Sequence, residues 1–155
     1  MRKYNSIDRF GKRGTQDVLE SGGYITITEK LDGANSSVQF IDGEIKCFSR
    51  NMELSESETL RGFYGWAQEH FSKYDREDGL ILYGEWLVPH KLDYGDNKNK
   101  FYLFDVYDTK HGYYLAWGDV VAIAGDYDLL TTPIFYHGEF KSIEHIQSFV
   151  GKSQL

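Results

Sequence analysis

The stretch that decides the fold covers residues 24–35 and reads YITITEKLDGAN. Apolar and polar side chains alternate over residues 24–29, and the β-branched side chains among them favour an extended strand. This strand leads directly into Lys30, and the Asp32-Gly33 pair that follows is typical of a turn. The stretch therefore predicts a strand that ends at a lysine, followed by a loop whose glycine lets the backbone approach a ligand closely.

Further strands are predicted downstream of this loop. Residues 37–41 and 44–48 flank Asp42-Gly43, a pattern typical of an antiparallel hairpin with a tight turn. Residues 80–88 and 101–107 are apolar and aromatic, and each run contains one acid, Glu85 or Asp105. Both runs are interpreted as strands, and shorter strands are predicted at residues 113–117 and 134–136.

Helical patterns occur between and after these strands. Ser55 and Glu58 match a capping box, and apolar residues then recur at helical spacing, so a helix is predicted from Ser55 to near Lys73. A short helix is predicted at residues 119–124 and a capped helix at residues 142–150. The chain is therefore expected to adopt an α+β fold with mainly antiparallel sheets and a few flanking helices.

Composition bounds the class of protein. The 155 residues suit one domain spanning residues 1–155, and 16% aromatic content favours a packed core over disorder. Cys47 is the sole cysteine, so no intrachain disulfide can form. A reducing cytoplasmic location is expected, and no apolar stretch predicts a membrane span.

Charge argues against a general nucleic-acid binder, because the formal net charge is −7 and phosphate affinity depends mainly on Lys and Arg. The charge is unevenly distributed, however. The first 13 residues contain a single acid and five basic residues, namely Arg2, Lys3, Arg9, Lys12 and Arg13. This basic start is interpreted either as a phosphate-facing arm or as a solvated terminus.

Lys30 is the candidate for covalent chemistry. A lysine amine attacks phosphorus only when it is unprotonated, so a nucleophilic lysine needs desolvation or cationic neighbours. Asp32 and Asn35 offer groups that can bind ribose hydroxyls or phosphate-linked waters, and Gly33 permits close approach. Lys-x-Asp-Gly alone is nevertheless more often a turn with an exposed lysine at its edge.

The order of several motifs adds a resemblance to a known family. Lys30-Leu31-Asp32-Gly33 is followed by Ser49-Arg50, Tyr83-Gly84-Glu85 and Phe101-Tyr102-Leu103-Phe104-Asp105-Val106. This series resembles the covalent nucleotidyltransferase superfamily of polynucleotide ligases and RNA capping enzymes. Within it, the chain is most similar to the nick-sealing RNA ligase 2 family, from about Lys3 to the C-terminus. Three features carry that closer likeness: the start Lys3-Tyr4-Asn5-Ser6-Ile7, the position of Asn35, and Leu92-Asp93-Tyr94-Gly95-Asp96.

The resemblance implies a partial nucleotidyltransferase domain with the ATP-grasp-like adenylylation fold of ligases. It implies that Lys30 attacks the α-phosphorus of ATP, expels pyrophosphate and becomes lysyl-AMP. The AMP would pass to a 5′-phosphate, and a 3′-hydroxyl would then displace it to seal nicked or broken RNA ends, as in RNA repair. Mg²⁺, or Mn²⁺ in its place, would be the metal cofactor, and RNA and ATP the partners.

The resemblance also assigns roles to the motif residues. Glu29 would help to recognise adenine, Arg50 would contact the ribose or bound nucleotide, and Glu85 would bind ribose or a metal-bound water. Phe104 would stack on the adenine, and Asp105 would support the site. Each role has a plain alternative: Phe104 as core, Glu85 paired with a basic side chain, and Arg50 as surface.

Two motifs of the family have no counterpart in this sequence. Family members continue with a Glu-Gly-containing strand and a strand bearing two lysines, and nothing after Tyr107 contains Glu-Gly. The expectation is a truncated domain with weak or absent activity, because loss of cationic phosphate clamps removes electrostatic stabilisation. The alternatives are an ATP-dependent DNA ligase, a capping-type nucleotidyltransferase, or a non-catalytic nucleotide- or RNA-binding remnant.

Overall fold

The computed structural model describes residues 1–8, 23–88 and 92–155. The chain divides into two compact units, which are considered separately below. The first unit comprises Met1–Tyr4 and Leu31–Thr132, and the second comprises Asn5–Lys30 and Pro133–Leu155. One domain over residues 1–155 therefore stays a prediction. In the described parts of the chain, no helix has both the length and the apolar character that a membrane span requires.

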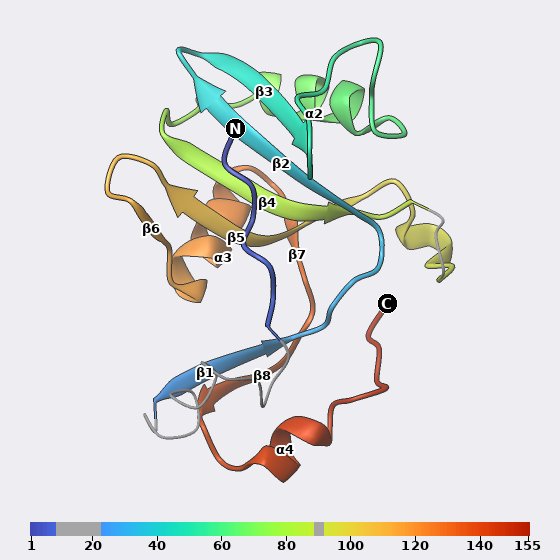
Figure 1. The fold of residues 1–155 in the computed structure, drawn as a ribbon, viewed down its shortest axis with the longest axis vertical. Helices are drawn as coiled ribbons and strands as arrows, with labels where there is room; N and C mark the ends of the chain where they lie inside the picture. The colour runs from blue at the N-terminus through green and yellow to red at the C-terminus, as the bar shows by residue number, and fades with distance from the viewer. Residues whose placement is uncertain (9–22, 89–91) are drawn as a thin grey trace. The chain divides into compact units, whose positions relative to one another are not determined.

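A six-stranded sheet forms the centre of the first unit (Figure 1). Four strands follow the order β3-β2-β4-β5 and pair antiparallel: β2 (Ala34–Ile41), β3 (Glu44–Ser49), β4 (Leu80–Trp86) and β5 (Phe101–Asp108). These strands confirm the hairpin and the two acid-containing strands, and the sheets confirm the α+β class. The short β7 (Leu130–Thr131) pairs with β5 in parallel, which the sequence did not predict.

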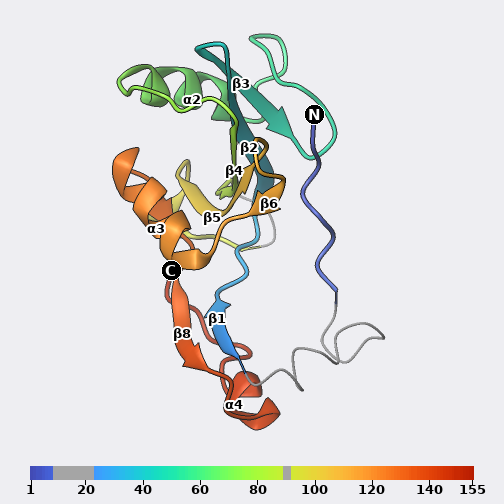
Figure 2. The ribbon, with the colours of Figure 1, turned by 90° about the vertical axis from the view of Figure 1, so that its left-hand side faces the viewer.

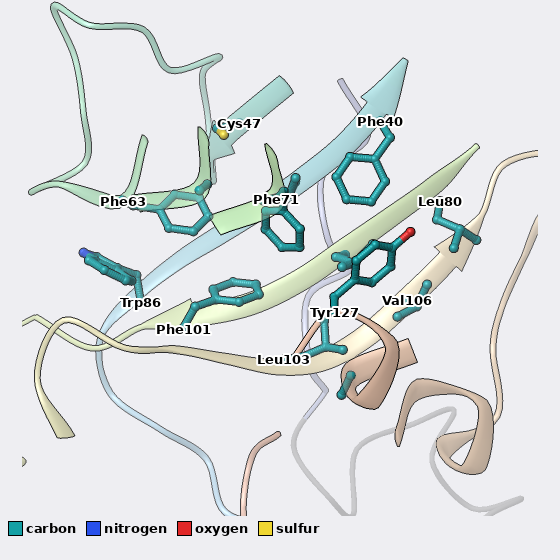
Figure 3. Close-up of a cluster of buried hydrophobic side chains, with 14 of the residues drawn as sticks. Phe40, Cys47, Phe63, Phe71, Leu80, Trp86, Phe101, Leu103, Val106 and Tyr127 are labelled. Atoms are coloured by element: carbon teal, nitrogen blue, oxygen red, sulfur yellow. The ribbon is translucent and has the colours of Figure 1, made fainter. Parts of the chain in front are cut away.

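One face of this sheet forms the hydrophobic core. Figure 2 shows the helices α2 (Phe63–Ser72) and α3 (Trp117–Asp126) on this side of the sheet. Aromatic rings from strands and helices interlock in the core, with Phe40 and Phe71 centroids 5.3 Å apart and Phe63 and Phe101 centroids 5.4 Å apart (Figure 3). Each fully buried ring of this kind contributes about 1.5–3 kcal/mol to stability. Because side chains alternate along a strand, the polar motif residues lie on the opposite face.

The predicted capping box is wrong. Ser55 and Glu58 form an isolated antiparallel bridge, in which each backbone N–H donates to the other residue's carbonyl at 3.1 Å. Helix α2 begins only at Phe63, after three residues with positive φ, of which Gly62 (φ 93°) is the last. A helix cannot run through such a left-handed segment, so the helical spacing before Phe63 does not produce a helix. The predicted end is confirmed, because Lys73 is the C-cap.

Another boundary also differs from the prediction. The strand predicted at residues 113–117 is only β6 (Tyr113–Tyr114), because Trp117 already begins α3. The helix predicted at residues 119–124 is therefore present but longer at both ends. A 3-10 turn, η1 (Gly95–Asn97), lies within the turn-rich polar segment before β5.

The second unit contains a two-stranded ribbon, in which β1 (Tyr24–Thr28) pairs antiparallel with β8 (Ile134–Glu139) (Figure 1). Both strands were predicted. Helix α4 (Ile143–Gln147) follows, and the Ser142 side chain accepts a hydrogen bond from the His145 backbone N–H at 3.1 Å. The predicted cap is thereby confirmed. None of the side chains in the ribbon is fully buried.

Candidate functional site

The loop after Lys30 is fastened to β4 by Glu85. The Glu85 carboxylate accepts a hydrogen bond from the Gly33 backbone N–H at 3.0 Å, and Asn35 pairs with Glu85 across the strands. A Cβ at Gly33 would lie 2.5 Å from the Trp86 carbonyl oxygen, so only glycine fits this approach. The structure therefore brings Gly33, Asn35 and Glu85 together on the polar side of the sheet.

Gly84 has a packing role next to this acid. A Cβ at Gly84 would lie 2.4 Å from the Phe101 ring and 2.6 Å from the Tyr102 carbonyl oxygen. The β4–β5 register also shifts here, because Tyr83 pairs with Asp105 while Gly84 pairs with Leu103. Phe104 is thus the extra residue of a β-bulge, a feature that redirects side chains locally.

Phe104 and Asp105 lie together beside this bulge, and both are half-buried. The Asp105 carboxylate accepts hydrogen bonds from the Tyr4 hydroxyl and from the Val106 backbone N–H, each at 3.0 Å. Burial raises the pKa of Asp105 above its ordinary value, and the two hydrogen bonds act in the opposite direction. The ring of Phe104 meets the ring of Tyr4 edge-on, with centroids 4.9 Å apart.

Asp32 and Arg50 flank the same sheet. The backbone N–H of Asp32 donates to the Tyr94 hydroxyl at 2.9 Å, so Tyr94 fixes the loop that follows Lys30. Arg50 is exposed and follows directly after β3, whose last residue, Ser49, pairs with Ser36. Arg50 therefore lies at the end of the sheet where Asn35 of β2 pairs with Glu85 of β4.

Lys30 and Glu29 belong to the second unit. Lys30 is exposed and lies between the end of β1 and Leu31. Glu29 is 8% exposed, and its two carboxylate oxygens accept hydrogen bonds from the Ser153 hydroxyl at 2.5 Å and the Gln154 backbone N–H at 2.9 Å. The residue expected to read adenine is therefore already engaged by this chain's own residues.

Sequence reasoning did not single out several residues that contact the candidate site. Tyr4 and Tyr94 each stood within a stretch quoted for the family likeness, but no periodicity or spacing indicated their contacts. The contacts of Ser153 and Gln154 with Glu29 join residues more than 120 positions apart and had no local signal. The basic residues Arg9, Lys12 and Arg13 lie outside the described residues, so the phosphate-facing arm stays a prediction.

Comparison with known proteins identifies the family of this chain. The family model for RNA ligase matches residues 23–154. The chain therefore belongs to the RNA ligase family. No curated protein matches the chain.

Solved structures give the same fold. An apo variant of the Naegleria gruberi RNA ligase matches with a TM-score of 0.63 and 25% identity, covering 86% of this chain and 42% of that chain. A variant of that enzyme with ATP and Mn has a TM-score of 0.61 and 25% identity, covering 85% and 43%. A third variant, with AMP and Mn, has a TM-score of 0.60 and 25% identity, covering 86% and 43%. The chain thus spans less than half the length of these relatives.

Proposed function

We propose that this chain carries the nucleotide-accepting part of an ATP-dependent RNA ligase of the nick-sealing RNA ligase 2 type, as a single adenylylation domain over residues 1–155. The observation that carries the proposal is the Gly33–Glu85 hydrogen bond, because it joins the lysine loop to the acid of a second motif. The family match over residues 23–154 supports it.

In the proposed first step, the Lys30 amine attacks the α-phosphorus of ATP. A bond forms between the lysine nitrogen and the α-phosphorus. The bond between the α-phosphorus and the oxygen that bridges to the β-phosphate breaks, so pyrophosphate leaves, and the amine loses its proton. Lys30 is exposed, so its amine is not desolvated by the described residues. The bound nucleotide would have to exclude water, and Arg50 would supply a permanent positive charge for the anionic ligand.

The remaining site residues would hold the nucleotide. Phe104 would stack on the purine, an interaction worth about 1–3 kcal/mol per base. Asn35 and Asp32 would bind ribose hydroxyls or phosphate-linked waters. Glu29 would recognise the adenine edge only after exchanging its contacts with Ser153 and Gln154, because both carboxylate oxygens are already hydrogen-bonded.

A divalent metal fits the residues of this site in a limited way. The Glu85 carboxylate and the neighbouring Asn35 amide are the hard oxygen donors that Mg²⁺ and Mn²⁺ accept. Among the described residues, no three His, Cys, Asp or Glu side chains gather to hold a metal. Such an ion would therefore be held chiefly by phosphates and water, and it would neutralise phosphate charge during transfer.

The proposed cycle continues with RNA. The AMP would pass from Lys30 to a 5′-phosphate, and a 3′-hydroxyl would then displace it to join the two ends. RNA with nicked or broken ends is therefore the proposed substrate, and the cytoplasm is the proposed location.

A second candidate is a nucleotide-binding module without catalysis. The exposure of Lys30 favours it, because a nucleophilic lysine needs desolvation or cationic neighbours. An intact Lys30 favours the enzyme, because a module that only binds has no need of a nucleophile.

The test is incubation with α-labelled ATP and Mg²⁺, read by intact mass and retained label. Wild type should gain one AMP, whereas Lys30→Ala and the charge-preserving Lys30→Arg should gain none. Lys110→Ala, which changes an exposed lysine in the β5–β6 turn, is the matched control and should behave as wild type.

The outcomes separate the candidates. Stabilisation by ATP without an adduct would favour the binding module, since a ligand of the native state raises apparent stability. Stabilisation by GTP but not ATP would favour a capping-type enzyme. If the protein gains no AMP adduct and no nucleotide raises its stability, the ligase proposal is refuted.

A further inference from the structure

The first four residues lie on the polar face of the sheet in the first unit. Met1–Tyr4 belong to this unit, and Figure 2 shows them on the side of the sheet opposite α2 and α3. The Tyr83 hydroxyl donates to the Arg2 carbonyl at 2.6 Å, and the Arg2 guanidinium lies 4.0 Å from the centre of the Tyr107 ring. This segment is therefore held by a hydrogen bond and a cation–π contact rather than lying loosely on the surface.

Tyr4 makes the contacts that concern the candidate site. Its hydroxyl donates to the Asp105 carboxylate at 3.0 Å, and its ring meets Phe104 at 4.9 Å and an interplanar angle of 72°. The same ring contacts Tyr83 at 5.2 Å and Tyr114 at 5.7 Å. The Tyr4 side chain thus contacts both Phe104 and Asp105, and it also packs against the rings of Tyr83 and Tyr114.

The bulge explains why this pair needs outside support. Phe104 has no partner residue opposite it on β4, and its side chain is only half-buried, so the ladder does not fix its ring. An edge-to-face neighbour restricts the ring and adds about 0.5–1.5 kcal/mol beyond area burial. Asp105 is a partly desolvated acid, and a hydroxyl donor compensates for part of that cost.

Tyr4 is suited to remain a donor. Burial, and then the neighbouring Asp105 charge, raise the pKa of Tyr4 far above its ordinary value, so its hydroxyl keeps its proton across the working pH range.

We propose that Tyr4 is a positioning residue of the nucleotide site, which holds the Phe104 ring and the Asp105 carboxylate in the orientation that receives the adenosine of ATP or AMP. The proposal rests on the proposed function, because it assumes that Phe104 stacks on the purine. Tyr4 itself need not touch the nucleotide.

The test measures ATP and AMP affinity by calorimetry, with the unfolding midpoint of the free protein as a parallel readout. Tyr4→Leu removes the ring and the hydroxyl and should weaken ATP binding about tenfold, whereas Tyr4→Phe keeps the ring and should recover part of that loss. Tyr113→Phe is the matched control, because Tyr113 is 53% exposed, and its affinity should equal that of wild type.

A double-mutant cycle separates positioning from a purely structural role. If Tyr4 acts through Phe104, Tyr4→Leu should cause little further loss of affinity when Phe104→Leu is already present. Additive losses, or an unchanged affinity in folded Tyr4→Leu, would overturn the proposal. If Tyr4→Leu does not fold, the cycle of Tyr4→Phe with Asp105→Asn decides by the same criterion.

Failure of the two proposals can be told apart. Wild type that binds neither ATP nor AMP refutes the proposed function and this inference together. Wild type that binds a nucleotide, with Tyr4 variants that bind equally well, refutes only the role of Tyr4.

Discussion

Two glycines of the sequence motifs lie where packing leaves no room for a side chain. Gly33 and Gly84 are each placed where a single added carbon would meet the backbone or a core ring. The sequence singled out Gly33 for ligand approach, yet its nearest neighbour in the structure is the backbone at Trp86. At the scale of one residue, the lysine and tyrosine-glycine-glutamate motifs are therefore coupled by packing.

Replacement of Gly84 tests this packing. We expect Gly84→Ala to lower the free energy of unfolding by about 1–3 kcal/mol, because the methyl group would overlap the Phe101 ring. Gly65→Ala is the control, since nothing lies within 4 Å of its added Cβ within α2, and it should stabilise by up to about 1 kcal/mol. Urea unfolding measures both, and equal stability of the two variants would contradict the packing role.

Asp105 gives a prediction with a defined pH dependence. Because burial raises its pKa in the folded state, the protonated form is favoured by folding. The stability that comes from the protonated Asp105 carboxyl is therefore fully present below the pKa of the unfolded state. It is lost as pH rises through the pKa of the folded state. Asp105→Asn cannot ionise, so its melting temperature should exceed that of wild type at pH 7, by ~2–4 °C per kcal/mol.

The same measurement at several pH values provides the check. The gap between Asp105→Asn and wild type should close below a pH of about 4, where the unfolded carboxyl is protonated. Asp108 is the contrasting acid, because its hydrogen bond with His111 lowers its pKa, so Asp108→Asn should change stability in the opposite sense at pH 7. A less stable Asp105→Asn at pH 7 would show that its hydrogen bonds outweigh burial.

At the scale of elements, strands differ in how well they are enclosed. β4 pairs on both sides, with β2 and β5, and six of its seven residues are buried. Among the described residues, β1 pairs only with β8, and neither strand holds a fully buried side chain. A two-stranded ribbon of this kind is only marginally stable alone.

Hydrogen exchange should reveal this difference. We expect the paired amides of β4 to exchange at least about a hundredfold more slowly than those of β1, which corresponds to about 2.7 kcal/mol in opening free energy. Mass spectrometry of peptic fragments, or amide NMR, measures the two strands in one experiment. Equal protection would mean that the ribbon opens only with the rest of the chain.

Local patterns account for what the sequence predicted at this scale. The hairpin at Asp42-Gly43, the two acid-containing strands and the Ser142 cap depend on neighbouring residues and were confirmed. The capping box failed because three consecutive residues adopt positive φ, and two of them are not glycine. Nothing in the residue types of Leu60 and Arg61 signals that backbone.

Across the whole molecule, long-range contacts limit what could be predicted. The sequence placed Gly33, Arg50, Glu85 and Phe104 in one site by motif order, whereas strand register is what brings them to one sheet. Tertiary packing determines three features that the sequence did not indicate. These are the parallel pairing of β7 with β5, the contact of the Tyr4 ring with the Phe104 ring, and the hydrogen bond from Ser153 to Glu29. The roles of the site residues stay predictions until the affinity and labelling experiments are done.

Net charge shapes the proposed encounter with RNA. At a formal charge of −7, general attraction to a phosphate backbone is weak, so recognition would have to depend on the chemistry of RNA ends and on local basic groups. Arg2 and Lys3 are two such groups in the first unit, and Lys3 donates to the Asn51 side chain at 3.4 Å, beside Arg50.

The anchored N-terminal segment also bears on how the protein is tagged and immobilised. The Arg2 carbonyl and the Tyr4 side chain both make contacts with the sheet. An affinity tag fused ahead of Met1 would therefore disturb the residues that contact Phe104. A fluorophore or surface linker is better placed on the β5–β6 turn, where the His111 side chain is 66% exposed. A nucleotide sensor built on this chain should therefore be attached through that turn, with its first residues left native.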